Sequence, residues 1–287
     1  MRVKDFELRK RFSEVSGVTA LIDENITIKL NKYGEYEEIV KEGIEILNDK
    51  VLKVSPNFND ETNEYEISKM YFGTSEGIKY NEYIGFYHSL YVGHALEGNF
   101  RSLGSSGGIG TWLLKELLDK KYVDYVIHVK KTNNKNLLFK YDISKTISEV
   151  IEGAKTKYYP VELSETLKFV KNNPGRYALI GIPSFIMAVR LLSEVEPVFK
   201  ERIKYMIGLV CGHQKSAKFS ESMAWQIGIP PGNLENIDFR VKLNNNNASE
   251  YGVTFVGKDV NNNKVKMTKS INDLIGQNWG LGYFKLY

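Results

Sequence analysis

Residues 177–192 read Y-A-L-I-G-I-P-S-F-I-M-A-V-R-L-L, and this stretch decides the fold class. Its continuous apolar start predicts a buried strand over residues 177–182. Glycine and proline then end the strand, and a helix is predicted from about Ser184, with its apolar positions over residues 185–192. A strand that leads directly into a helix is the repeating unit of α/β proteins.

The same alternation continues on both sides of this stretch, from residue 83 onward. It predicts strands over residues 87–93, 125–129, 206–210, 239–243 and 252–256, and helices over residues 111–118 and 217–227. We therefore expect an α/β fold with a mixed sheet and crossover helices. Residues 1–75 are polar and rich in turns, which predicts a small N-terminal segment with little core.

Composition and charge narrow the class of protein. The 287 residues are 42% apolar and 26% charged, which is typical of a globular chain with one or two cores. The 39 basic and 35 acidic residues are spread along the chain, which argues against a nucleic-acid partner or a membrane surface. Because no long apolar window and no signal-peptide core are present, we expect a cytoplasmic protein.

The stretch G-S-S-G-G-I-G-T at residues 104–111 is a loop of small residues that leads into the predicted helix at 111–118. Backbone amides at the start of a helix favour negative charge and suit a phosphate or the edge of a flavin. The stretch matches neither the P-loop nor the G-x-G-x-x-G spacing, and a tight turn with a serine cap explains the same residues. Both interpretations stay open.

Two further predicted strands end in polar or small residues. Ligands of open α/β sheets bind beyond the carboxyl ends of strands, so the turn at Pro183 and Ser184 and the loop at Cys211 and His213 are candidates. Ser184 as a helix N-cap and Cys211 as a small buried residue are the simpler interpretations. His213 is near Cys211 in sequence, but this does not bring a base within reach of the thiol.

Other residues that can carry chemistry are interpreted as structural. His88, His94 and His128 are scattered and have no metal-ligand spacing. The asparagine runs at 244–247 and 261–263 are expected at loop tips, because asparagine tolerates left-handed backbone angles.

Taken in order, the loops resemble the beta-subunit family of coenzyme F420-reducing hydrogenases, whose relatives include many bacterial proteins encoded near polysaccharide genes. Family members have S-S-G-G-x-x-T-A-L-L, S-K-Y-x-P, G-x-P-C-Q, I-G-L-x-C-G-x and N-W-G-x-G-F. This chain has SSGGIGTWLL from residue 105, TKYYP from 156, GIPSF from 181, IGLVCGH from 207 and NWGLGY from 278. The resemblance spans about residues 83–287.

This resemblance implies a flavin site, usually with FAD, and electron transfer among flavin, iron–sulfur clusters and either a small-molecule substrate or a redox partner protein. A homo-oligomer is compatible with it. The residues that it implies at the flavin are Ser105, Ser106, Gly107, Gly108, Thr111, Lys157, Pro183, Ser184, Cys211, His213 and Asn278. Lys157 would bring a positive charge to the phosphates or the ring, and a solvated lysine beside a turn is the alternative.

The chain departs from the family where relatives carry cluster ligands. Relatives begin with a segment resembling a two-cluster ferredoxin, with C-x-x-C-x-x-C and C-x-x-C-x-x-C-x-x-x-C-P. In this chain those positions are Ser13, Ser16 and Thr19, then Glu45, Asn48, Val51 and Ser55. Ser184 stands for a further family cysteine, and Cys211 is the single cysteine of the chain, which excludes an internal disulfide and an all-cysteine cluster.

We therefore expect a degenerate ferredoxin-like segment without iron–sulfur clusters over residues 1–75 and a flavin-binding domain over residues 76–287. The expected function is that of an FAD-dependent oxidoreductase-like protein whose flavin exchanges hydride directly with a small donor or acceptor. Two alternatives remain open. One is a non-redox binding or carbohydrate-biosynthesis protein that reuses the scaffold, and the other is a subunit that relies on the clusters of a partner.

Overall fold

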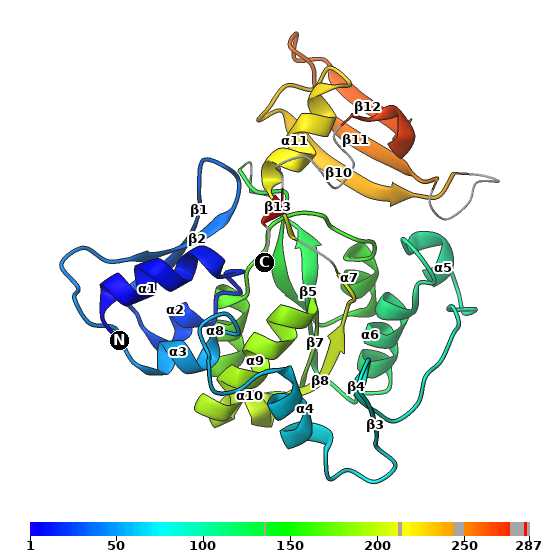
Figure 1. The fold of residues 1–287 in the computed structure, drawn as a ribbon. Helices are drawn as coiled ribbons and strands as arrows, with labels where there is room; N and C mark the ends of the chain where they lie inside the picture. Colours follow the sequence, from blue (N-terminus) through cyan, green and yellow to red (C-terminus); the bar gives the residue numbers. More distant parts are fainter. Residues whose placement is uncertain (135, 212–213, 244–249, 276–283, 286–287) are drawn as a thin grey trace. The chain divides into compact units, whose positions relative to one another are not determined.

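The computed structural model describes residues 1–134, 136–211, 214–243, 250–275 and 284–285 (Figure 1). The chain forms two compact units that interleave along the sequence. The first unit comprises Met1–Ile28, Glu38–Gly93 and Leu163–Val210, and the second comprises Lys29–Glu37, His94–Glu162 and Cys211–Tyr287. The division at residue 75 rests on the polar, turn-rich sequence and on the family resemblance, and it stays a prediction.

The N-terminal part of the chain, which belongs to the first unit except for Lys29–Glu37, consists of short elements around a small core. These are helices α1 (Val3–Arg9), η1 (Lys10–Phe12), α2 (Thr19–Ile22), α3 (Lys50–Val54) and α4 (Glu64–Phe72), and strands β1 (Ile26–Leu30), β2 (Tyr36–Val40), β3 (Lys79–Asn81) and β4 (Gly85–Tyr87). Phe6, Ile26, Leu47, Val51 and Phe58 are fully buried together. The core is small, as predicted, but its members could not be identified from the sequence because they are far apart and show no local period.

The rest of the first unit is the strand–helix–strand arrangement that the opening stretch predicts. Helix α8 (Ser164–Asn172) precedes strand β7 (Tyr177–Gly181), and helices α9 (Pro183–Val195) and α10 (Pro197–Arg202) connect it to strand β8 (Ile203–Gly208). β7 and β8 pair in parallel, which requires such a helical crossover. Pro183 is the first residue of α9, where a backbone N–H would have no partner within the helix, so its missing N–H costs no helical hydrogen bond.

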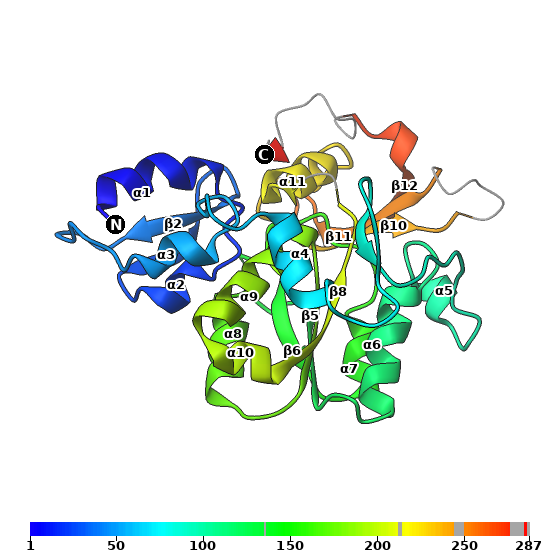
Figure 2. The ribbon, with the colours of Figure 1, turned by 60° about the horizontal axis from the view of Figure 1, so that its bottom comes forward.

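The second unit combines a helix-flanked hairpin with a three-stranded sheet (Figure 2). Its first elements are α5 (Phe100–Leu103), α6 (Ile109–Asp119), β5 (Tyr125–Lys131), β6 (Phe139–Ser144) and α7 (Ile147–Glu152). They are followed by β9 (Gln214–Lys215), α11 (Ala217–Trp225), β10 (Leu234–Val241), β11 (Gly252–Lys258), β12 (Lys264–Ser270), η2 (Ile271–Asp273) and β13 (Phe284–Lys285). β5 pairs with β6, and β11 with both β10 and β12, all antiparallel.

Aromatic packing holds the three-stranded sheet against its helix. Phe219 of α11 stacks on Phe239 of β10, with ring centroids 6.4 Å apart, and both are buried with Phe139, Met223 and Phe255. Because the chain contains both parallel and antiparallel strand pairs with connecting helices, the predicted mixed α/β class is confirmed.

Two predicted strands differ from the observed ones. Residues 87–93 were expected as a strand, but β4 ends at Tyr87 and the following residues have no strand structure. Leu90, Tyr91 and Val92 are exposed, so their apolar character does not reflect a buried strand. The strand expected at residues 206–210 begins and ends earlier, as β8, and Val210 is fully exposed.

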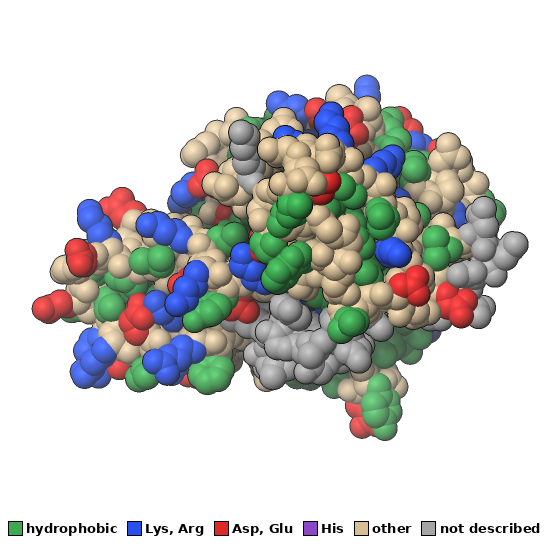
Figure 3. Space-filling view, turned by 90° about the horizontal axis from the view of Figure 1, so that it is seen from above, with side chains coloured by type: hydrophobic (Ala, Val, Ile, Leu, Met, Phe, Trp, Pro, Cys, Tyr) green, Lys and Arg blue, Asp and Glu red, His purple; other side chains and the backbone are tan. Residues whose placement is uncertain are grey.

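The distribution of surface charge and the lengths of the helices agree with what the sequence predicts about charge and apolar stretches. Basic and acidic side chains are intermixed on the face drawn in Figure 3. None of the helices in the described ranges is both long and apolar enough to cross a bilayer. Within the same ranges no three His, Cys, Asp or Glu side chains group together as metal ligands would.

Candidate functional site

The loop before α6 is closed by backbone packing that only glycine permits. A Cβ on Gly104 would lie 2.8 Å from the Cα of Gly108 and 2.9 Å from the carbonyl oxygen of Phe100. Gly108 has φ 78°, and a Cβ there would clash with the same carbonyl. The turn interpretation of residues 104–108 is therefore correct, and close packing explains both glycines.

The amides of this loop and of the first turn of α6 have no acceptor within the described residues. The first helical hydrogen bond runs from the Trp112 amide to the Gly108 carbonyl, 3.1 Å away. No side chain caps the helix, and the Ser105 hydroxyl instead accepts a hydrogen bond from the Thr156 amide at 2.9 Å. The serine-cap alternative is wrong, and seven consecutive amides, of residues 105–111, stand at the positive end of an 11-residue helix.

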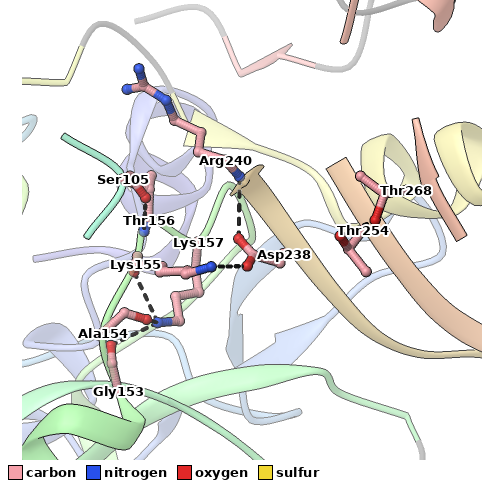
Figure 4. Close-up of polar contacts among 10 residues, drawn as sticks. All are labelled: Ser105, Gly153, Ala154, Lys155, Thr156, Lys157, Asp238, Arg240, Thr254 and Thr268. Carbon is pink, nitrogen blue, oxygen red and sulfur yellow. Dashed lines mark hydrogen bonds and ion pairs between the residues drawn. The ribbon is translucent and has the colours of Figure 1, made fainter. Parts of the chain in front are cut away.

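Lys157 fixes the turn that follows α7, and Thr156 of this turn is hydrogen-bonded to the loop. Its ammonium donates to the carbonyl oxygens of Gly153 at 2.7 Å, Lys155 at 2.9 Å and Ala154 (Figure 4). Burial lowers the pKa of Lys157 to about 8, with Asp238 opposing the shift and Lys155 adding to it. The alternative of a solvated lysine is wrong, because three carbonyl groups surround the charge.

Lys155 is held in a strained backbone conformation. Its φ is 77°, a left-handed value that costs a residue with a Cβ roughly 1 kcal/mol or more. Its ammonium forms an ion pair with Asp238 of β10, and about a quarter of each side chain is exposed (Figure 4). The Asp238 carboxylate also accepts a hydrogen bond from the Arg240 amide at 3.3 Å.

Lys242, directly after β10, reaches the loop from another direction. Its ammonium donates to the carbonyl oxygen of Ser106 at 3.1 Å and to that of Arg101 in α5. Partial burial and the nearby charges of Arg101, Lys155 and Arg240 lower the pKa of Lys242. These basic residues could not be identified from the sequence, because Lys242 and Arg101 are 141 positions apart and belong to no motif.

The remaining predicted site residues are Pro183, Ser184, Cys211, His213 and Asn278. Pro183 and Ser184 belong to the first unit, at the start of α9, and the N-cap of that helix is Ile182 and not Ser184. Cys211 is exposed, so its interpretation as a small buried residue is wrong. His213 and Asn278 lie outside the described residues.

Lys215 is a second enclosed lysine, and no sequence feature had indicated it. It lies on β9 with 8% of its surface exposed, and its ammonium lies 4.0 Å from the ring centroid of Phe219. Burial lowers the pKa of Lys215 to about 8, and Cys211 opposes the shift. A cation over an aromatic face is a stable arrangement for a partly desolvated lysine.

Each of the three histidines in the described residues has its own separate contact. His128 is buried on β5 and its Nε2 lies 2.8 Å from the Ser144 hydroxyl, which confirms a structural interpretation. His94 contacts the Arg101 guanidinium at 2.9 Å, and His88 contacts Ser89; both lie outside strands.

Comparisons with known proteins identify the family. Residues 90–168 match the N-terminal part of the family described as coenzyme F420 hydrogenase/dehydrogenase, beta subunit, and residues 175–276 match the C-terminal part of the same family. A comparison with curated proteins found no match. A chain of the F420-reducing NiFe hydrogenase complex from Methanosarcina barkeri is similar in structure, with 15% identity and a TM-score of 0.44.

That alignment covers 64% of this chain and 62% of the hydrogenase chain, so this chain spans less than two thirds of its length. The two family matches lie side by side and cover both the loop at residues 105–111 and the basic residues around it. Together they include more than half of the sequence. The chain therefore belongs to the coenzyme F420 hydrogenase/dehydrogenase beta-subunit family, whose members are oxidoreductase-like subunits.

Proposed function

We propose that this protein is a flavin-dependent, oxidoreductase-like protein that binds FAD at the start of α6. The supporting observation is the run of seven amides, from residue 105 to residue 111, that have no acceptor within the described residues. Amides at the positive end of a helix fit the phosphates of a flavin nucleotide. Bound FAD would supply hydride exchange with a small donor or acceptor.

Different residues at the loop would bind the phosphates or hold the loop in position. The amides from Ser105 to Thr111 and the hydroxyls of Ser106 and Thr111 would donate hydrogen bonds to phosphate. Lys157 would act as a positioning residue, because its ammonium already donates to three carbonyl groups. It holds the segment that carries Thr156, which in turn binds the Ser105 hydroxyl.

The proposal includes the absence of iron–sulfur clusters held by this chain alone. It rests on the single cysteine, since four soft thiolates normally hold such a cluster. Electrons would then pass directly between the flavin and a small molecule, or to a redox partner protein that brings its own centres.

FAD titration of the purified protein, followed by flavin fluorescence and by absorbance, tests the proposal. We expect Ser106→Asp to weaken FAD binding about tenfold or more, because it places a carboxylate where the phosphates would lie. Ser148→Asp is the matched control: it makes the same change at another exposed serine of the same unit, on α7. A colourless wild-type protein that takes up no added FAD would contradict the proposal.

A further inference from the structure

Residues 78–92 form an exposed arm of the first unit. The arm consists of the β3–β4 hairpin and the segment that follows it, and no third strand pairs with this hairpin within the described ranges (Figure 1). No residue between Ile67 and Ala95 is buried, so the arm has no core of its own. Because a two-stranded hairpin alone is only marginally stable in water, the arm depends on contacts outside itself.

Three aromatic rings hold the base of the arm on α4. The rings of Tyr80 in β3 and Phe86 in β4 have centroids 5.0 Å apart, and each lies 5.7 Å from the ring of Tyr65 in α4. The Asn81 side chain accepts a hydrogen bond from the Tyr83 amide at 2.9 Å and fixes the turn between the strands. The hairpin therefore has a defined conformation and presents the side chains beyond its base to solvent.

The arm exposes a large amount of apolar surface. Tyr80, Tyr83 and Tyr91 are 54%, 86% and 89% exposed, which corresponds to roughly 450 Å² from three side chains. Leu90 is 72% exposed and Val92 is fully exposed. With these two residues the arm comes close to the roughly 800 Å² that each partner buries in a protein–protein interface of standard size. Apolar patches on the surface of a typical monomer are smaller, and larger ones mark interaction sites.

The charge of the arm allows it to contact a copy of itself. Among residues 78–92 there is one acidic residue, Glu82, and one basic residue, Lys79. A strongly acidic or strongly basic arm would repel its own copy, and a balanced one does not. The chain therefore carries an apolar surface of the right size and charge for a symmetric interface.

We propose that residues 78–92 are a dimerisation arm, and that the same arm of a second copy of this chain covers its apolar surface. The two copies would be related by a twofold axis, which is the commonest symmetry of soluble oligomers. Each copy would bury Tyr83, Tyr91 and Val92 against the other, and the removal of this apolar surface from water would drive association. Dimerisation of this kind requires no flavin, so it can be tested apart from the proposed function.

Sedimentation equilibrium of the purified full-length chain, from the low to the high micromolar range, measures the association. We expect a species of twice the mass of the chain that dissociates on dilution. Hydrogen exchange followed by mass spectrometry, in the same range, should show slower exchange of the amides of residues 78–92 as the dimer forms. This second measurement needs no variant.

Charged substitutions locate the interface. Val92→Glu and Tyr83→Glu should each raise the Kd of the dimer about a hundredfold or more, because the twofold axis brings two carboxylates into the interface. Both side chains are exposed, so the monomeric variants should keep the thermal midpoint of the monomeric wild type. The matched controls are Val260→Glu and Tyr33→Glu, at exposed positions of the second unit, and both should dimerise as the wild type does.

A wild-type chain that stays monomeric over the whole range overturns the inference. Slow exchange of the arm in that monomer would mean that its own chain covers it, and fast exchange would leave its surface to a different protein. A dimer that Val92→Glu and Tyr83→Glu both leave intact also overturns the inference, because another surface then joins the two copies.

Discussion

His128 on β5 is packed against the backbone at residue 153. A Cβ on Gly153 would clash with the imidazole, so that position must be glycine. The ring is 3% exposed, and its Nε2 lies 2.8 Å from the Ser144 hydroxyl. Burial lowers the pKa of His128 to about 4, assisted by the charges of Lys130 and Lys157 and opposed by Asp142 and Glu149. The imidazole is therefore neutral in the folded protein at physiological pH.

This burial predicts acid sensitivity. Between about pH 6.5 and pH 4 the unfolded chain takes up a proton at His128 that the folded chain does not, so the free energy of unfolding falls as the pH falls. The loss is at most about 3 kcal/mol. Urea unfolding at pH 7 and pH 4.5 should show a smaller difference for His128→Gln than for wild type. His88→Gln, at an exposed histidine, is the control, and an equal pH dependence in all three proteins would contradict the prediction.

The structural role of His128 could be predicted from the scatter of the histidines, but its surroundings could not. Gly153 follows it by 25 positions and belongs to no pattern that the sequence reveals. The same holds at the candidate site. The small residues of 104–111 are adjacent and visible as a motif, whereas Lys155 and Asp238 are 83 positions apart and meet only in the folded chain.

Helix α7 shows how a short element is kept in place at both ends. Six residues are too few for a stable isolated helix, because nucleation is costly. The Thr146 hydroxyl and the Glu149 carboxylate form a capping box at its start. Directly after the helix, the Lys157 ammonium donates to the carbonyl groups of residues 153–155 and so fixes the turn that follows α7.

Removing the ammonium should loosen this element. Lys157→Met keeps much of the side-chain volume but leaves the three carbonyl groups without their donor, which should cost about 1–3 kcal/mol of the free energy of unfolding. Thermal or urea unfolding measures this loss, and Lys140→Met, at an exposed lysine of β6, should change the stability by less than about 0.5 kcal/mol. Equal stability of the two variants would show that the carbonyl groups find other partners.

Elements with a strong local pattern could be predicted from the sequence. β7 and α6 match their expected ranges closely, since each has the apolar period of its structure over its whole length. β10 begins at Leu234, five positions before the predicted start, because Glu235 and Asn236 interrupt the apolar pattern. The strand predicted over residues 87–93 is absent from the structure after Tyr87. The prediction was wrong because an exposed apolar run has the same composition as a buried strand.

Over the whole molecule, five of the seven positions that the resemblance assigns to cluster ligands are buried in the first unit, whereas Glu45 and Asn48 are exposed. Ser13, Ser16, Thr19 and Ser55 are buried, and the Thr19 hydroxyl donates to the Glu38 carboxylate at 2.6 Å. Val51 is fully enclosed in the apolar core of this segment. Buried hydroxyls and an apolar core can hold a small segment together without a metal, provided that the polar groups are bonded.

This packing predicts that the first unit folds independently of iron. Protein from iron-depleted growth should have the same thermal midpoint as protein from standard medium, because no thiolate set links folding to metal binding. Anaerobic incubation with iron and sulfide should add no broad visible absorption, and Cys211→Ser should behave as wild type in the same experiment. Stabilisation by iron, or cluster absorption that disappears in Cys211→Ser, would show that the chain recruits its one exposed thiol to a shared cluster.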